Sequence, residues 1–300
     1  MIKVTLKDGS VKEFPAGISA YEAAKEISTG LARNACAAKI NGKNADLRDT
    51  LNEDCELEIL TFDDEYGKRT FRHTASHIMA QAVKRLYPHA KLAIGPAVDD
   101  GFYYDFDLET KFTPEDLAKI EAEMKKIVKE DIKLERSYKS RNEAVEFFKE
   151  KNEPYKVELA EDIPEGEDIS FYTQGEFTDL CAGAHLMSTG AVKAFKLTSA
   201  TGAYWRGDSS KKMLCRVYGT AFPKASELEA HLNMLEEAKK RDHNKLGREL
   251  ELFTTVDIIG QGLPIMLPKG AKIIQILQRF VEDEEARRGW QLTKTPYMAK

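Results

Sequence analysis

The first 62 residues show the alternation of apolar and polar positions that is typical of short strands. Apolar residues recur at every second position in residues 2–6, and an Asp-Gly turn leads into a second segment at residues 11–14, which predicts a β-hairpin. A short helix is expected to open at Ser19, where Glu22 completes a capping box. With a further Asn-Gly turn and a last strand near residues 57–62, this order of elements predicts a ubiquitin-like β-grasp domain, which we interpret as a binding or spacing module without catalytic residues.

Residues 63–223 mix helical and strand periods, and they predict a single α+β domain with helices interrupting a mostly antiparallel sheet. Apolar spacing predicts a helix that contains residues 73–86 and ends before Pro88, and Thr113 and Ser140 each open another helix. Pro154 is expected to stop the last of these, which would leave Lys156 as a solvated strand residue. Strands are predicted at residues 102–107, 169–172, 192–198 and 213–218, with residues 203–206 forming a hairpin with the last of them.

Residues 224–300 show helical periodicity with little to pack against. Ser226 is expected to cap a linker helix over residues 224–248, whose basic segment at residues 239–245 is either a solvated face or a contact for a polyanion. A second amphipathic helix is predicted from Ile273 to Gly289. An amphipathic helix needs tertiary packing for its stability, so we expect these 300 residues to be the front part of a longer protein.

Composition narrows the class of protein. The chain has 300 residues, 42% hydrophobic and 32% charged, with a net charge of −5; these values predict two or three soluble domains. No apolar run approaches the length of about 20 residues that spans a membrane. Its four cysteines are scattered, without a disulfide-like framework, and suggest a reducing cytoplasm. The acidic balance does not point to nucleic acid, although a local basic face would suffice to bind it.

Two short motifs carry the candidate chemistry. HTASH places His73 and His77 four residues apart, and CAGAH places Cys181 and His185 four residues apart later in the chain. If the first motif is helical, both imidazoles lie on one face; the small spacer of the second suits a tight loop as well as a helix. Cysteine and histidine are the usual ligands of zinc, and they also serve as bases, acids and nucleophiles in acyl transfer. The spacing leaves both kinds of site open.

Two further observations bear on these motifs. HTASH has no glutamate after its first histidine, so it lacks the general base of the HExxH metalloproteases, and we exclude that class. Asp179 lies two residues before Cys181 and could orient a neighbouring side chain. Isolated pairs of this spacing are common without function, but the clustering of a few histidines in both motifs favours a functional site.

The chain resembles bacterial threonyl-tRNA synthetases in three motifs that follow a β-grasp module. In chain order these are HTASH, IGPAVDDGFYYDFD (residues 94–107) and DLCAGAH (residues 179–185). Residues 1–62 resemble the TGS domain of that family, and residues 63–223 resemble its editing domain. Residues 249–300 resemble the truncated start of a class II synthetase core. The similarity rests on LGRELELF, which begins at Leu246, and on LPKGAKI and KTPYM, with motif 1 around residues 280–298. The rest of that core, with the threonine-binding zinc of the family, is expected beyond residue 300.

The resemblance implies an activity for the whole enzyme and another for this part. The full-length enzyme would join threonine to its tRNA with ATP, magnesium and one zinc, as a cytoplasmic homodimer; the fragment can be a monomer and needs no cofactor of its own. The part present would hydrolyse tRNA mischarged with serine. Serine lacks only one methyl group of threonine, which supports a discrimination of only about 1–3 kcal/mol, so a second, hydrolytic pocket is physically reasonable.

By resemblance, the catalytic residues are expected to be His73, His77, Cys181, His185 and Lys156, and the substrate-binding residues to be Tyr104 and Asp179. We expect His73 to be the base or to position water, and Lys156 to be its electrostatic partner. We expect the Asp179 carboxylate to bind the ammonium group of the substrate. Cys181 could act as a nucleophile, but we interpret it first as a polar group that shapes the pocket.

A zinc ion with all four motif side chains as ligands would have no open position for water. We therefore expect an ion-free pocket with ordered water and hydrogen-bonded side chains. Two other hypotheses remain. One is a free-standing, zinc-dependent deacylase of the alanyl-type editing family, which would have no use for a class II entry after residue 226. The other is a non-catalytic β-grasp regulatory protein, which leaves the clustering of histidine and cysteine unexplained.

Overall fold

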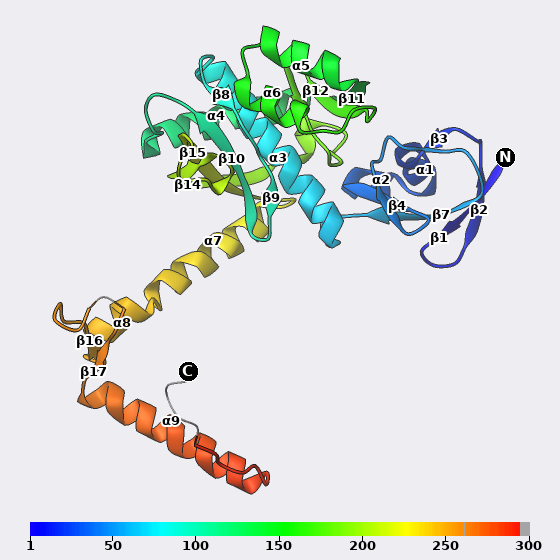
Figure 1. The fold of residues 1–300 in the computed structure, drawn as a ribbon. Coiled ribbons are helices and arrows are strands. Elements are labelled where there is room, and N and C mark those ends of the chain that lie inside the picture. Colours follow the sequence, from blue (N-terminus) through cyan, green and yellow to red (C-terminus); the bar gives the residue numbers. More distant parts are fainter. Residues whose placement is uncertain (261, 295–300) are drawn as a thin grey trace. The chain divides into compact units, whose positions relative to one another are not determined.

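The computed structural model describes residues 1–260 and 262–294, and the chain divides into two compact units, Met1–Glu229 and Ala230–Lys300 (Figure 1). The first unit contains the predicted β-grasp fold and the α+β fold that follows it. None of the helices in these described ranges is both long enough and apolar enough to cross a membrane.

The β-grasp part begins with the predicted hairpin, in which Ile2 pairs with Phe14. Its five-stranded sheet has the order β2-β1-β7-β4-β5, with β1 parallel to β7 and the other neighbours antiparallel. The predicted capping box of Ser19 and Glu22 is present and starts the helix that covers the sheet. The elements are β1 (Ile2–Leu6), β2 (Val11–Phe14), β3 (Ile18–Ser19), α1 (Ala20–Ile27), α2 (Thr29–Asn34), β4 (Ala37–Ile40), β5 (Lys43–Ala45), β6 (Thr50–Leu51) and β7 (Cys55–Leu60).

The α+β part is built around one long buried helix, α3, which packs against α4, β10 and β15. Its strands form two antiparallel sheets, β14-β15-β10-β8 and β11-β12-β13, where the sequence predicted one. The elements are α3 (Glu65–Leu86), β8 (Lys91–Leu92), β9 (Ala97–Val98), β10 (Gly101–Asp107), α4 (Pro114–Glu130), β11 (Leu134–Lys139), α5 (Arg141–Glu150), α6 (Pro154–Glu161), β12 (Ile169–Gln174), β13 (Phe177–Leu180), η1 (Thr189–Ala191), β14 (Ala194–Tyr204), η2 (Trp205–Gly207) and β15 (Met213–Phe222).

Two local predictions in this part are wrong, and one is incomplete. The helix before Pro154 ends as expected, at Glu150, but Pro154 also begins a further helix, α6, because proline suits the first position of a helix. Lys156 therefore lies on a helix, and its side chain is buried. The two segments expected at residues 192–198 and 203–206 are not separate strands, because one strand, β14 (Ala194–Tyr204), covers most of both and residues 205–206 lie in η2. The predicted hairpin with β15 is present, and the register of β14 shifts between Leu197 and Ser199.

The C-terminal elements agree only partly with their predictions. Ser226 lies inside α7 (Ala225–Lys240) and does not cap it, and the helical segment breaks before α8 (His243–Glu249), which Asp242 caps. β16 (Phe253–Thr254) pairs with β17 (Ile265–Met266). The predicted amphipathic helix is present as α9 (Pro268–Arg287). Its apolar side chains are exposed in the described part of the chain, and Phe280, for example, is 63% exposed. The last part of the predicted motif 1, residues 295–298, lies outside the described residues.

The predicted domain boundaries lead to a proteolysis experiment. We expect trypsin to cut first within residues 239–248, where basic side chains are exposed at the end of α7 and along α8. A fragment that contains residues 1–223 should survive, because buried cores hold it together. Mass spectrometry of a time course checks this, and early cuts within residues 80–200 would contradict the proposed division.

Candidate functional site

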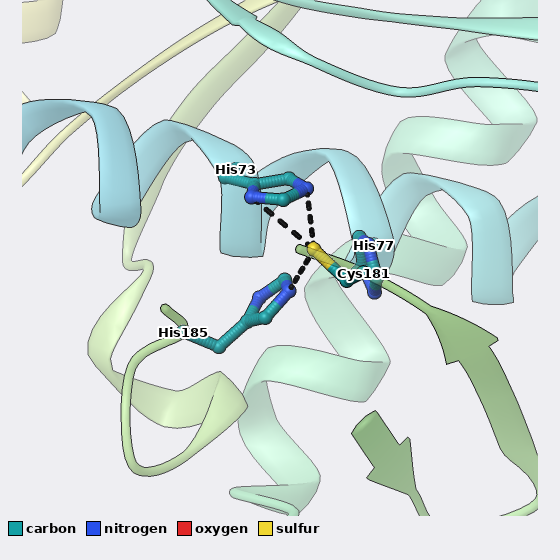
Figure 2. A group of neighbouring side chains, drawn as sticks. All are labelled: His73, His77, Cys181 and His185. Atoms are coloured by element: carbon teal, nitrogen blue, oxygen red, sulfur yellow. Dashed lines mark hydrogen bonds between the residues drawn. The ribbon is translucent and has the colours of Figure 1, made fainter. Parts of the chain in front are cut away.

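The two sequence motifs meet in one cluster, which we call the histidine–cysteine cluster: His73, His77, Cys181 and His185 (Figure 2). Helix α3 supplies the first two side chains on one face, as predicted, and the loop after β13 supplies the other two. The nitrogen and sulfur atoms of the four side chains all lie within 4.8 Å of one another. His73 is partly exposed, whereas the other three members are buried.

The thiol lies at the centre of the cluster. Cys181 Sγ is 3.2 Å from Nε2 of His73 and 3.3 Å from Nε2 of His185. Gly183 allows this close approach, because a Cβ atom at that position would lie 3.1 Å from Nδ1 of His73. The small spacer of the second motif is therefore a loop that folds against the first motif.

Burial sets the protonation of the cluster. It lowers the pKa of His73 to about 4, with smaller contributions from the positive charges of Lys156 and Arg69. Burial also lowers the pKa values of His77 and His185 well below the usual value, and it raises the pKa of the Cys181 thiol to about 12. Near pH 7 the imidazoles are neutral and able to accept a proton, whereas the thiol is protonated and a weak nucleophile.

A second buried group lies beside the cluster and contains the other three predicted residues. The Lys156 ammonium is 2.7 Å from Oδ1 of Asp179, and the Tyr104 hydroxyl donates a hydrogen bond of 2.6 Å to Oδ2 of the same carboxylate. All three side chains are buried. The carboxylate predicted to hold a substrate ammonium is thus already paired with Lys156, whose ammonium occupies the place of such a cation.

Comparison with known proteins places these motifs in a family context. Residues 2–61 match the TGS domain, and residues 169–218 match the threonyl and alanyl tRNA synthetase second additional domain. Over all 300 residues the chain is 63% identical to threonine–tRNA ligases of Clostridium perfringens (strain SM101) and Clostridium botulinum (strain Alaska E43). Over 296 residues it is 60% identical to that of Acetivibrio thermocellus.

The chain matches the N-terminal part of threonine–tRNA ligases. It spans 46% of the length of these relatives, which is about half. The resemblance inferred from the motifs and the predicted fold class are therefore confirmed, with a TGS domain in front of an editing-type domain. Because the match covers only part of each relative, the activity of a complete ligase is a matter for proposal.

The donor set of the cluster could hold zinc. Three imidazoles and a thiol are ligands that tetrahedral zinc accepts, at distances of about 2.0–2.3 Å from the metal. Nδ1 of His77 is buried and has no hydrogen-bond partner among the described residues, so one nitrogen is available as a ligand. A four-coordinate ion would engage the imidazoles that otherwise accept protons.

We expect the pocket of the purified protein to be free of zinc, because a metal bound by all four side chains would leave no open position for water. Elemental analysis of the protein prepared without chelator measures this directly. One zinc per chain, lost together with activity in His77→Ala, would contradict the prediction.

Sequence patterns did not reveal the residues that hold the cluster in place. Asp46 and Arg48 lie in the β-grasp part, between β5 and β6, and they contact the backbone of the loop that carries His185. Thr74 lies between the two histidines of α3 and contacts Nδ1 of His185 at 3.2 Å. Two charged residues flanking a single leucine are too common a pattern to indicate such contacts.

Proposed function

We propose that the histidine–cysteine cluster hydrolyses the ester bond of tRNA mischarged with serine. The observation that carries the proposal is the convergence of three neutral imidazoles and one thiol within 4.8 Å, of which only His73 is partly exposed. The similarity of the surrounding fold to the threonyl and alanyl tRNA synthetase second additional domain supports this function. His73 is the member that can reach a water molecule and an incoming ester.

In the proposed reaction, His73 accepts a proton from water as the water oxygen attacks the ester carbonyl. The tetrahedral intermediate then collapses, and the imidazolium returns the proton to the departing ribose oxygen. General base catalysis of this kind contributes about 10²- to 10⁴-fold. The Lys156 ammonium adds positive potential beside the site. This potential favours the neutral form of His73 before the reaction, and it stabilises the oxyanion that forms during the reaction.

We further propose that the chain acts as part of a threonine–tRNA ligase. Its partner would be threonine-specific tRNA, and its compartment the cytoplasm. ATP, magnesium and a zinc ion would serve a synthetic site in the remaining part of such an enzyme, which would assemble as a homodimer; this chain alone can be a monomer. The relatives are threonine–tRNA ligases, and this and the TGS domain support tRNA as the partner.

Incubation of the purified chain with seryl-tRNA tests the proposal. Serine should be released faster than in buffer, and threonine-dependent exchange of pyrophosphate into ATP should be absent. Stable seryl-tRNA would contradict the hydrolytic function. Pyrophosphate exchange would contradict the assignment of the synthetic site to another part of the enzyme. The alternative of a free-standing zinc deacylase is not favoured, because the match to the ligases continues through residue 300.

A further inference from the structure

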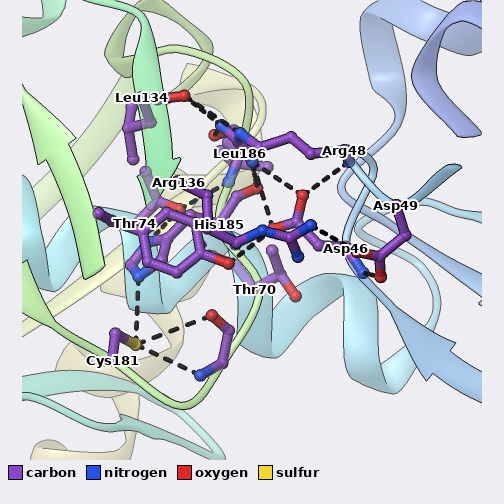
Figure 3. Close-up of polar contacts among 12 residues, drawn as sticks. Asp46, Arg48, Asp49, Thr70, Thr74, Leu134, Arg136, Cys181, His185 and Leu186 are labelled. Atoms are coloured by element: carbon purple, nitrogen blue, oxygen red, sulfur yellow. Dashed lines mark hydrogen bonds and ion pairs between the residues drawn. The ribbon is translucent and has the colours of Figure 1, made fainter. Parts of the chain in front are cut away.

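The β-grasp part contacts the backbone of the second motif directly. Its loop between β5 and β6, residues 46–49, lies against the loop that carries His185 (Figure 3). We call residues 46–49 the anchor loop. Asp46 is 4% exposed, and the Arg48 side chain is 13% exposed. These are unusual positions for charged residues, which are rarely buried without partners.

Arg48 uses its guanidinium to hold three carbonyl oxygens. It donates hydrogen bonds to the carbonyls of Leu134 at 2.7 Å, His185 at 3.0 Å and Leu186 at 2.8 Å. Its remaining donors bind the Leu134 carbonyl again through Nε and the Asp46 carboxylate through Nη1. All groups of the five-donor fork therefore have acceptors, and a lysine ammonium, with three donors at one point, could not reproduce this pattern.

Asp46 completes the contact from the same loop. Its Oδ2 atom accepts hydrogen bonds from the backbone N–H of His185 at 3.3 Å and from the Tyr172 hydroxyl at 2.9 Å. The Tyr172 ring centroid lies 4.4 Å from that of His185. The anchor loop thus holds both the N–H and the C=O of His185, and it also holds the aromatic ring that packs on the imidazole.

Helix α3 fixes the imidazole from the other side. The Thr74 hydroxyl donates its single hydrogen to the Thr70 carbonyl at 3.0 Å, so its oxygen accepts from Leu186 N–H at 3.0 Å and from Nδ1 of His185 at 3.2 Å. This pattern of hydrogen bonds assigns the proton of His185 to Nδ1. The Nε2 atom, which faces Cys181 Sγ, is then unprotonated.

We propose that Asp46 and Arg48 are positioning residues of the hydrolytic site, so that the β-grasp part is an integral component of that site. Their role is to hold His185, through its own backbone, at the distance from Cys181 that the cluster requires. The proposal rests on the hydrolytic function proposed above. It gives the β-grasp part a role that the sequence did not indicate, since residues 1–62 were expected to be a binding or spacing module.

The test compares Asp46→Asn and Arg48→Lys with the unaltered chain. Both substitutions preserve approximate size, and Arg33→Lys, at an exposed position of the same β-grasp part, is the matched control. A displaced catalytic group costs up to about 100-fold in rate, so kcat for seryl-tRNA hydrolysis should fall about 10- to 100-fold. KM should change less than about twofold, because neither residue is placed against the substrate.

A cooperative thermal unfolding transition identifies the variants that fold. If Arg48→Lys does not fold, the kinetic result of Asp46→Asn alone decides the proposal. Unchanged kcat in the folded variants, or a fall caused by KM alone, would overturn the proposal. Nitrogen NMR of the His185 ring provides a readout independent of activity. It should show a protonated Nδ1 in the unaltered chain and altered ring signals in both variants, and unaltered signals would overturn the proposal. If the unaltered chain hydrolyses no seryl-tRNA, the proposed function fails, and the NMR result alone decides the positioning role.

Discussion

Replacing His73 with alanine should lower the rate of seryl-tRNA hydrolysis by about 10²- to 10⁴-fold, the usual contribution of a general base. His73 is the only member of the cluster that is partly exposed, and its nitrogen lies 3.2 Å from the Cys181 thiol. Single-turnover release of serine measures the effect. His89→Ala, at an exposed position after the same helix, is the matched control and should retain the full rate.

The pH dependence offers a second readout of the same residue. Because burial lowers the pKa of His73 to about 4, its base form persists as the pH falls from 8 to 5. The enzyme-catalysed rate, corrected for spontaneous hydrolysis, should therefore stay nearly level over this range. A histidine with its ordinary pKa of about 6.5 would lose most of its base form below pH 6. A fall in rate centred near pH 6.5, or a full rate in His73→Ala, would remove His73 from the role of base.

The second large effect concerns the buried ion pair. Among the described residues, Lys156→Met leaves the buried Asp179 carboxylate with only the Tyr104 hydroxyl as a side-chain partner. Breaking a buried pair in this way costs about 3–5 kcal/mol of the free energy of unfolding. Urea unfolding of the chain measures this loss. Lys125→Met removes a lysine from a surface pair with Glu121, with the lysine side chain 66% exposed, and should cost at most about 1 kcal/mol.

The double variant Lys156→Met, Asp179→Asn separates stability from electrostatics at this pair. Removing both charges should restore part of the lost stability, because no uncompensated charge remains buried. Hydrolysis should stay below that of the unaltered chain, because the positive potential beside His73 is gone. Equal stabilities of the single variant and the unaltered chain would show that the pair is not buried as the structure describes.

The sequence predicted those parts of the site that depend on local spacing. His73 and His77 share a face because they lie four residues apart on a helix, and the capping residues Ser19, Thr113 and Ser140 begin helices as expected. These features depend on a few neighbouring residues. The resemblance to a family then joined the two motifs, which spacing alone could not do, because more than one hundred residues separate His77 and Cys181.

Features that depend on tertiary packing were missed. Lys156 was expected on a solvated strand, yet it is buried against Asp179, because helix α6 places it where a carboxylate from another element is available. In the sequence Arg48 looks like an ordinary surface arginine. Its partners outside its own loop are backbone carbonyls, which leave no signature in a sequence. The sequence pattern predicted that Ser226 caps a helix, but Ser226 lies inside α7, which already begins at Ala225.

The most direct test of the central claim compares two substrates on the same tRNA. Threonine-specific tRNA, charged with serine in one sample and with threonine in the other, is incubated with the purified chain, and release of each amino acid is followed. A second site that selects the smaller product should hydrolyse the seryl ester about 10-fold faster or more, the discrimination that one methyl group supports. Equal release of serine and threonine, or release of neither above the buffer control, would contradict the assignment of this cluster as a site that removes serine.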